Sequence, residues 1–383
     1  LAVAYNFTST FVVQQLYADL KYRCLGLSIG SKERYSEFNN PLLSSGGLTF
    51  SGNARPAPQV RIGIPEYTLV PGTKEWLAFK GHIAYGMFTD DGWQKDFVVP
   101  GGKHTEHVLY HSKDLYVKIG NREKFPLIFE GGLEMAAQFG GNAFKGNGKI
   151  DMPNGIKDFF KVFIPSGGSS DTPMGEQTNI YGNHLGSWNF SLTWHASKDW
   201  TIRPYYEHYF EDHSQMFGEY GWKDCLAGVE ITFPKNPVIS GFVYEYISTK
   251  DQTGAVYWDH TPEIPEQVSG ADNYYNHSIY TGWQHWGLGI GNPLVMSPIY
   301  NTDGDISFKS SRMQGHHFGV MGTPCADLQY RVLLLVTRNW GTYGVPFYEI
   351  KKNGNALVEL IYTPHQLKGW DFTGSLGVDR GGM

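Results

Sequence analysis

The chain of 383 residues lacks several features that mark common protein classes. Its three cysteines, Cys24, Cys225 and Cys325, are too few and too widely separated for a disulfide framework or a CxxC metal site. Only 18% of the residues are charged, against about 25% in an average soluble chain. No apolar run approaches the ~18 residues of a membrane-spanning helix. A membrane β-barrel is not excluded, because its strands give a much weaker signal.

The net charge, the first residues and the composition of the chain narrow the possible protein classes a little further. A net charge of −6 gives no reason to expect a nucleic-acid partner, because phosphate backbones require a basic surface. The chain starts at Leu1 without Met or a signal peptide, so we expect a processed or partly ordered product. Glycine is abundant with 47 residues, and aromatic residues make up 15% of the chain. This composition indicates many turns and a large interfacial surface.

Apolar and polar residues alternate with a period of two along most of the chain, which is typical of strands with two different faces. The alternating segments are often about 9–12 residues long, the length that crosses a bilayer at a tilt. Short turns alternate with long segments between them. In "WNFSLTWHAS" (188–197), Trp188, Phe190, Leu192 and Trp194 share one face, opposite Asn189, Ser191, Thr193 and His195. Similar alternation predicts strands at 76–88, 127–139, 200–211, 225–233 and 370–378.

The composition of the two faces distinguishes a soluble β-sandwich from a membrane barrel. A sandwich buries its apolar face between two sheets, whereas here Trp and Phe lie at strand ends, as in the aromatic girdles of barrels. The polar faces mix charged side chains with small ones, as a crowded interior would. We therefore predict an all-β fold: a transmembrane antiparallel β-barrel forming a single domain over residues 1–383. The polar interior network is predicted to include Glu130, Glu134, Arg203, Glu207 and Glu211.

Three segments, near 41–74, 146–187 and 251–305, are too long to be simple connections, and such segments are usually functional. In the second, Ile156, Phe159, Phe160 and Phe163 have helical spacing, and we expect this patch to fold inward. The third interleaves aromatic rings with amides and imidazoles. This mixture suits a glycan, because rings pack against sugar C–H faces while polar groups bind hydroxyls. The candidate polysaccharide-binding residues are Trp258, Tyr274, Tyr275, Trp283, Gln284, His285 and Trp286.

The alternative for these residues is that the aromatic rings only fix the third segment inside the barrel. Catalytic and metal-binding patterns are weak. His104, His107 and His111 would be scattered along the strand that "HVLY" predicts. Glu207 and Glu211 share a face but lie ~13 Å apart along one strand, too far for a glycosidase pair. Nothing in these patterns therefore argues for catalysis, for a cofactor or for a metal.

Five stretches resemble the capsule-assembly Wzi family, in the version found in Bacteroidetes-type bacteria. The similarity covers nearly the whole chain, and its longest stretch is also the most specific. The stretches are "SGNARP" (51–56), "EGGLEMAAQFGG" (130–141), "RPYYEHYFEDHS" (203–214), "NHSIYTGWQHWGLGIGNPL" (276–294) and "TRNWGTYG" (337–344).

The resemblance implies an outer-membrane β-barrel of about eighteen strands, with a lumen closed by loops and short helices, at the surface of a Gram-negative bacterium. It implies a lectin-like, non-enzymatic protein that binds and anchors exported capsular polysaccharide. Outer-membrane lipid and the polysaccharide export machinery would be its other partners. The chain ends at "DRGGM" without a terminal aromatic strand, so we expect both ends to be incomplete. The alternatives are a porin or sugar-uptake channel, and a soluble secreted glycoside hydrolase.

Overall fold

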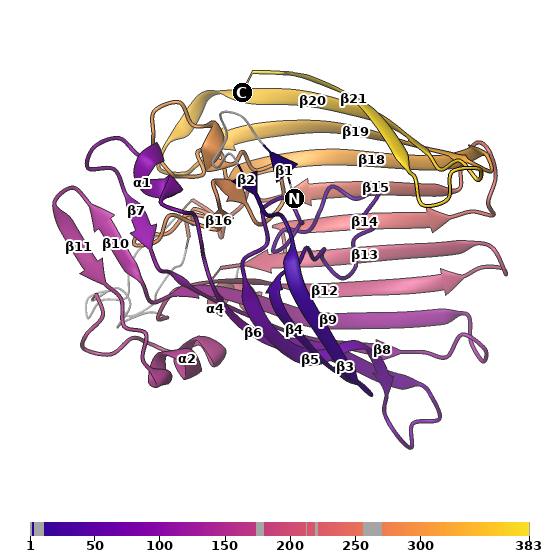
Figure 1. Cartoon of the computed structure of the whole chain (residues 1–383), viewed down its shortest axis with the longest axis horizontal. Coiled ribbons are helices and arrows are strands. Elements are labelled where there is room, and N and C mark those ends of the chain that lie inside the picture. Colours follow the sequence, from indigo (N-terminus) through magenta and orange to yellow (C-terminus); the bar gives the residue numbers. More distant parts are fainter. Residues whose placement is uncertain are drawn as a thin grey trace.

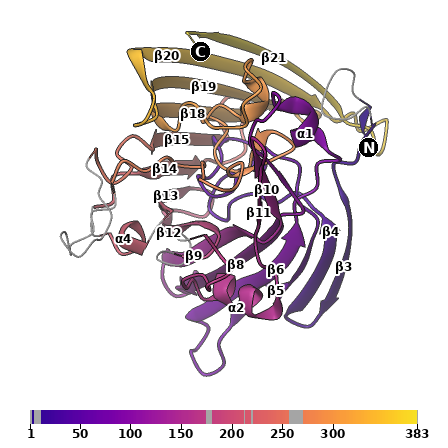
Figure 2. The same ribbon diagram turned by 90° about the vertical axis from the view of Figure 1, so that its left-hand side faces the viewer.

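One antiparallel sheet of fourteen strands dominates the computed structural model, which describes residues 2–3, 11–173, 180–211, 213–218, 221–255 and 270–382. The strands lie side by side in the order β21-β20-β19-β18-β15-β14-β13-β12-β9-β8-β6-β5-β4-β3 (Figure 1). Seen from the left-hand end of Figure 1, the sheet curves around a central space that other parts of the chain occupy (Figure 2).

The strands of the large sheet are 7 to 17 residues long. They are β3 (Leu16–Tyr22), β4 (Leu25–Ser31), β5 (Gln59–Leu69), β6 (Leu77–Met87), β8 (Leu109–Ile119), β9 (Leu127–Phe139), β12 (Asn183–His195), β13 (Thr201–Phe210), β14 (Cys225–Thr232), β15 (Gly241–Ser248), β18 (Arg312–Cys325), β19 (Leu328–Gly341), β20 (Pro346–Tyr362) and β21 (Phe372–Gly381).

Short elements accompany this sheet. A three-stranded sheet contains β7 (His104–Glu106), β10 (Asn142–Lys145) and β11 (Gly148–Asp151), and two-stranded sheets join β1 (Ala2–Val3) to β2 (Phe11–Val12) and β16 (Gln284–His285) to β17 (Leu288–Gly289). The helices are α1 (Trp93–Phe97), α2 (Ile156–Phe163), α4 (His213–Met216) and the 3₁₀ turn η1 (Pro298–Tyr300). Within the described residues, no helix is both long and apolar enough to span a membrane.

The all-β prediction is confirmed, and the six alternating segments form strands close to their predicted limits. Two details differ. The segment near 41–74 is not a loop throughout, because β5 begins at Gln59; the flanking Pro and Gly residues had concealed its alternation. β3 and β21 are the edges of the sheet and do not pair with each other among the described residues, so closure and the count of about eighteen strands are not confirmed.

β12 shows how the two faces of the sheet differ. The side chains of Asn189 and Ser191 face the interior and are 1% and 3% exposed, whereas Leu192 and Trp194 face outward and are 41% and 46% exposed. The alternation places apolar groups outside and hydrogen-bonding groups inside, because successive side chains of a strand point to opposite faces. The predicted division of faces is confirmed in this strand.

The two ends of the sheet are also different. At one end the strands are joined by short turns, such as 196–200 and 326–327; at the other they are joined by longer segments such as 88–108, 140–182 and 249–311. We call the second end the long-segment rim. In Figure 1 it lies on the left, with α1, α2 and β16.

The segment 32–58, which joins β4 to β5, enters the interior of the sheet and is held there by carboxylates. The backbone amides of Leu48 and Thr49 donate to Glu207 of β13 at 2.9 and 3.0 Å. The amide of Ser45 donates to Glu245 of β15 at 2.7 Å. These acceptors satisfy amides that have no strand partner, as buried backbone groups require.

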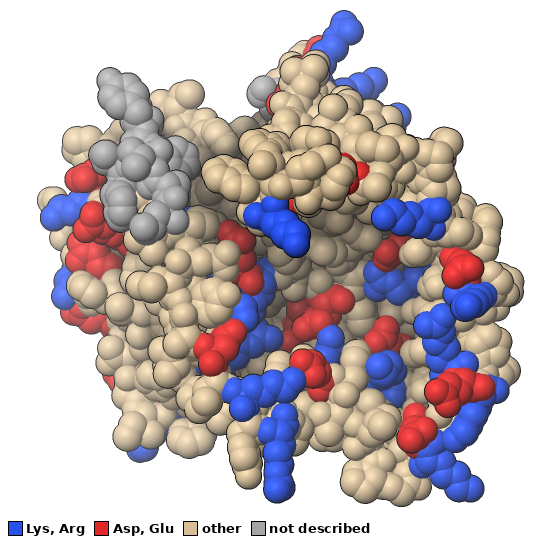
Figure 3. Space-filling model, turned by 45° about the vertical axis from the view of Figure 1, so that its right-hand side comes forward, with Lys and Arg blue, Asp and Glu red and all other residues tan. Residues whose placement is uncertain are grey.

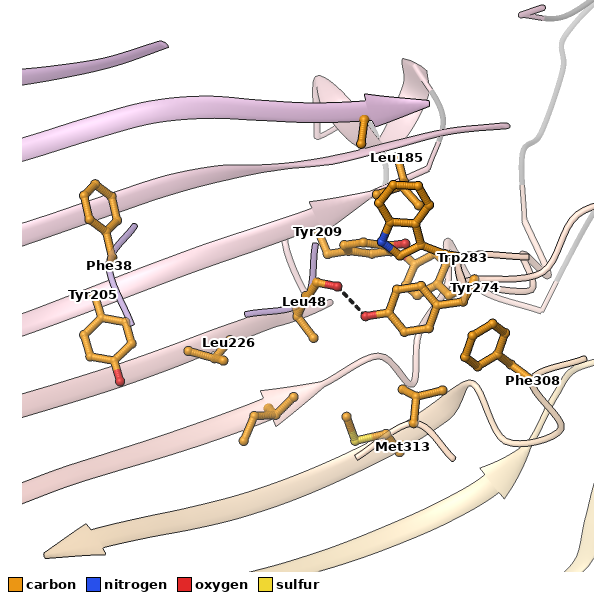
Figure 4. Packing of buried hydrophobic residues seen from close by; sticks show 14 of the residues in the cluster. Phe38, Leu48, Leu185, Tyr205, Tyr209, Leu226, Tyr274, Trp283, Phe308 and Met313 are labelled. Atoms are coloured by element: carbon orange, nitrogen blue, oxygen red, sulfur yellow. Dashed lines mark hydrogen bonds between the residues drawn. The ribbon is translucent and has the colours of Figure 1, made fainter. Parts of the chain in front are cut away.

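The main apolar cluster lies between this inner segment and the long-segment rim. Leu48, Tyr209, Tyr274 and Trp283 meet there, with Phe308 and Met313 nearby (Figure 4). Trp283 is fully buried, and its ring stacks at 6.1 Å on Tyr110 of β8. The interior of the curved sheet is therefore a packed core near the rim.

Helix α2 lies on the outer side of the sheet, which corrects the expectation that its apolar patch folds inward. Phe159 packs on Tyr85 and Phe139, which belong to the outward faces of β6 and β9. The hydroxyl of Tyr85 donates to the Phe159 carbonyl at 2.9 Å. Ile156 and Phe160 remain 80% and 67% exposed. Helical spacing showed which residues share a face, but not on which side of the sheet the helix packs.

Replacing Glu207 with Ala should destabilise the inner segment 32–58, because the two buried amides of Leu48 and Thr49 lose their side-chain acceptor. We expect the free energy of unfolding to fall by about 3 kcal/mol, measured by urea unfolding of the purified protein, with faster proteolysis within 32–58. The matched change Glu66→Ala removes a carboxylate that is 77% exposed and pairs with Lys21, so it should cost less than about 1 kcal/mol. Equal effects of the two changes would contradict this role of Glu207.

Candidate functional site

Residues 270–305, the described main part of the segment predicted to bind a glycan, pack inside the curved sheet and are called the aromatic segment below. Tyr274, Tyr275 and Trp283 are each at most 1% exposed. The Trp283 Nε1 donates to the Thr49 carbonyl at 2.9 Å, and the Tyr275 hydroxyl donates to the Leu48 carbonyl at 2.5 Å. These contacts join the aromatic segment to the segment 32–58. They support the alternative interpretation, in which the rings fix the loop, while direct sugar contact stays a prediction.

The other predicted residues of this segment are also engaged. Gln284 accepts from the Gly287 amide at 2.8 Å. His285 donates from Nδ1 to the Arg55 carbonyl at 2.6 Å and accepts at Nε2 from the Thr89 amide at 3.2 Å. This pattern requires a neutral ring, in agreement with burial that lowers the pKa of His285 to about 4.

Trp286 differs from its neighbours because a cation lies on its ring: the guanidinium of Arg55 is 3.9 Å from the ring centroid. Trp286 is 7% exposed. Trp258 lies outside the described residues. Six of the seven predicted residues are thus described by the structure. Hydrogen bonds within the chain engage the polar groups of five of them, Tyr274, Tyr275, Trp283, Gln284 and His285.

The predicted polar network also has different partners from those expected. Arg203 pairs with Glu230 of β14, not with Glu207 or Glu211. Glu211 accepts from the Tyr275 amide at 2.6 Å. The residues of β9 accept from hydroxyls, with Tyr116 and Ser187 donating to Glu134 and Ser191 donating to Glu130. The inner carboxyl groups therefore mainly accept from backbone amides and hydroxyl groups.

A cavity of about 340 Å³ lies beside the packed core, between the segment 32–59 and the inner faces of β6, β8 and β9. The sheet leaves room there because Arg61 of β5 is followed across the strands by Ala84 and Ser112. A second hollow of about 220 Å³ adjoins it and shares Arg34, Arg61, His82 and Asp114. Figure 3 shows the hollowed face of the molecule, with Lys, Arg, Asp and Glu side chains inside the hollow.

The cavity is lined by both cations and carboxyl groups, and two of its cations are the guanidinium groups of Arg34 and Arg61. Arg34 donates to Ser28 Oγ at 2.8 Å and to the Lys32 carbonyl at 3.1 Å, and it makes no ion pair within the described part of the chain. Arg61 lies 3.8 Å from the Asp114 carboxylate. Burial and the neighbouring charge of Arg61 lower the pKa of Arg34 to about 10, so Arg34 stays cationic at neutral pH.

Other groups in the cavity are also free to bind a polar ligand. Arg55 Nη1 and Gln59 Oε1 line it, are buried, and have no hydrogen-bond partner among the described residues. Buried polar atoms are normally paired. The rings of Phe50 and Tyr110 form part of the wall. Donors, acceptors and ring faces together are the combination that binds sugars.

No pattern in the sequence points directly to this cavity. Arg34 and Arg61 lie in or beside the segment interpreted as a long loop, and only the alternation of "QVRIGI" (59–64) could have shown that Arg61 points inward. His104 and His111 do not share a site, since His104 stacks on Phe144 and His111 on Tyr85. Among the described residues, no three His, Cys, Asp or Glu side chains are grouped so that they could hold a metal ion.

Comparisons with known proteins support the fold. No protein-family model and no curated protein matches the chain significantly. A solved structure does: Wzi, an outer-membrane protein involved in group 1 capsule assembly in Escherichia coli, described as a carbohydrate-binding β-barrel. The match has a TM-score of 0.60 at 12% sequence identity and covers 100% of this chain and 69% of that chain. At this identity the similarity is one of fold.

If the aromatic segment fixes the loops, Trp283→Ala should destabilise the protein whether or not a glycan is present. Removing a buried indole leaves a cavity, and we expect a loss of about 3–5 kcal/mol in the free energy of unfolding, measured by urea titration. Tyr348→Ala is the control, because Tyr348 is fully exposed, and it should change the stability little. If the Trp283→Ala protein is as stable as the wild type and is cleaved within 270–311 no faster, the anchoring role is contradicted.

Proposed function

We propose that the chain is a non-enzymatic outer-membrane β-barrel protein of the Wzi type, which binds and anchors exported capsular polysaccharide at the surface of a Gram-negative bacterium. One observation carries the proposal: the fourteen-stranded sheet is apolar outside and polar inside, and its interior holds both packed segments and a polar cavity. The fold similarity to a carbohydrate-binding outer-membrane barrel supports it.

The outer face supports the membrane location. Exposed apolar side chains follow one another along the outward faces of the strands, a far larger patch than soluble monomers usually expose. Closure of the sheet would pair all backbone groups, as hydrocarbon requires. The exposed side chains of α2 extend the apolar surface at the long-segment rim. Among the outward residues of this belt are Ile83, Leu115, Phe129, Leu192, Trp194, Phe318, Leu334, Val336, Val358, Leu360, Leu376 and Val378.

The interior supports a binding protein more than an open channel. The segment 32–58 and the aromatic segment occupy the interior and are joined by the Trp283–Thr49 and Tyr275–Leu48 hydrogen bonds. The cavity beside them is of the size of a small-ligand site. We therefore assign polysaccharide binding to the cavity with Arg34 and Arg61, and we assign the role of scaffold to the buried aromatic rings.

Arg61→Gln should weaken polysaccharide binding, because a guanidinium in the cavity donates to sugar hydroxyls or carboxylates. We expect the affinity to fall about tenfold or more on an array of bacterial capsular polysaccharides. Arg122→Gln removes an exposed arginine from a short turn and should leave binding unchanged.

The same array can locate the contact surface. If Trp286→Ala weakens binding while Arg61→Gln does not, the sugar contacts the aromatic segment instead of the cavity. If the wild-type protein binds no polysaccharide on the array, binding itself is contradicted.

The porin alternative makes an opposite prediction about conductance. Because the inner segments are packed and hydrogen-bonded, we expect nearly silent records from the purified protein in planar lipid bilayers. The unboiled protein should also run as a compact band on a gel and shift on heating, as closed barrels do. Stable open-channel currents would favour a porin or sugar-uptake channel. A soluble protein without a heat-dependent shift would contradict the membrane barrel.

A further inference from the structure

A groove of about 670 Å³ lies on the outward face of the sheet, across β15, β18, β19, β20 and β21. Tyr246, Gln314 and His316 form one wall, and Gln314 donates to the Tyr246 hydroxyl at 3.0 Å. The other side carries three cations, Arg338, Lys352 and Arg380. No Asp or Glu is among the described residues that line the groove.

The sheet register brings the three cations together. Arg338 and Lys352 are directly opposite on neighbouring strands, and Arg380 is opposite Gly354, two residues further along β20. Like charges in opposite positions destabilise a sheet. None of the three side chains makes an ion pair or hydrogen bond with another described residue. In a chain of net charge −6, this is a local excess of positive charge that nothing in the described structure neutralises.

The position of the groove indicates what neutralises these charges. Arg338 lies near the end of β19 and Arg380 near the end of β21, at the long-segment rim. On the same outward faces, towards the short turns, the apolar side chains of Val336, Leu334 and Val378 are exposed. A ligand that fits both surfaces has anionic groups next to hydrocarbon chains.

We propose that this groove binds a phosphorylated glycolipid of the outer leaflet, with its phosphates on Arg338, Lys352 and Arg380 and its acyl chains on the apolar belt. Long connecting segments of outer-membrane barrels are extracellular, which places the rim at the level of outer-leaflet head groups. Cations at such a level attract lipid phosphates, and Arg binds them through paired donors. The inference rests on the proposed membrane location but not on polysaccharide binding.

The test is lipid retention by the purified, detergent-solubilised protein, counted by native mass spectrometry. The probe is lipid A carrying two phosphates, compared with the same lipid after removal of its phosphates and with inorganic phosphate. The triple variant Arg338→Gln, Lys352→Gln, Arg380→Gln should retain about tenfold less lipid A than the wild type. The matched control removes three exposed lysines from the opposite, short-turn end and should retain as much as the wild type; its changes are Lys198→Gln, Lys235→Gln and Lys368→Gln.

Each outcome decides the proposal. Equal retention by the triple variant, or equal binding of dephosphorylated lipid A, would overturn it. Displacement of lipid A by an equal concentration of inorganic phosphate would show a site for a free anion and overturn the lipid assignment. If the triple variant does not fold, the salt dependence of the wild type decides, because phosphate contacts must weaken as salt rises. A heat-dependent gel shift without lipid A retention would count against the groove alone, not against the barrel.

Discussion

The carboxylate of Glu207, which accepts the amides of Leu48 and Thr49, represents the constraint on which the interior depends. Chain that leaves a sheet and crosses its inside has no strand partners, yet its buried amides must be paired. Inward-facing carboxylates provide the acceptors: Glu245 receives the Ser45 amide, and Glu211 receives that of Tyr275. The inside of this sheet carries acidic side chains where irregular segments need acceptors for their amides.

The cavity is a consequence of the same arrangement. Once Leu48 is fixed against β13, its carbonyl holds Tyr275 and the neighbouring Thr49 carbonyl holds Trp283. The aromatic segment then fills the interior near the rim, while the inner segment spans the space above the small side chains of β6 and β8. Space remains where the small side chains of Ala84 and Ser112 lie next to Arg61 on β6 and β8. The hydrogen bonds at Leu48 and Thr49 therefore determine both the packed interior and the cavity next to it.

The sequence predicted what depends on alternation and not what depends on packing. The faces of β12 follow from the period of two, and Leu192 and Asn189 lie on the expected sides. Alternation does not reveal whether an aromatic ring is buried by other parts of its own chain. The residues next to Trp283 in the sequence are of the kinds that also flank a sugar-binding tryptophan. Arg61 was missed because β5 lies within a Pro- and Gly-rich segment. Arg34 lies outside any alternating stretch of sequence. Only the folding of the inner segment 32–58 into the sheet brings Arg34 close to Arg61.

Helix α2 and the cationic groove occupy different parts of the outer surface, but both lie at the same height along the strands, near the long-segment rim. The helix buries Phe159 against β6 and β9 and exposes Phe160, as an amphipathic helix at an interface does. The groove replaces apolar side chains by Arg338 and Lys352 a few residues before the strands end. Charge on the lipid-facing side of a barrel is costly at the bilayer midplane and inexpensive near the interface. If the protein spans the outer membrane as proposed, both features agree with a membrane boundary just below the long-segment rim.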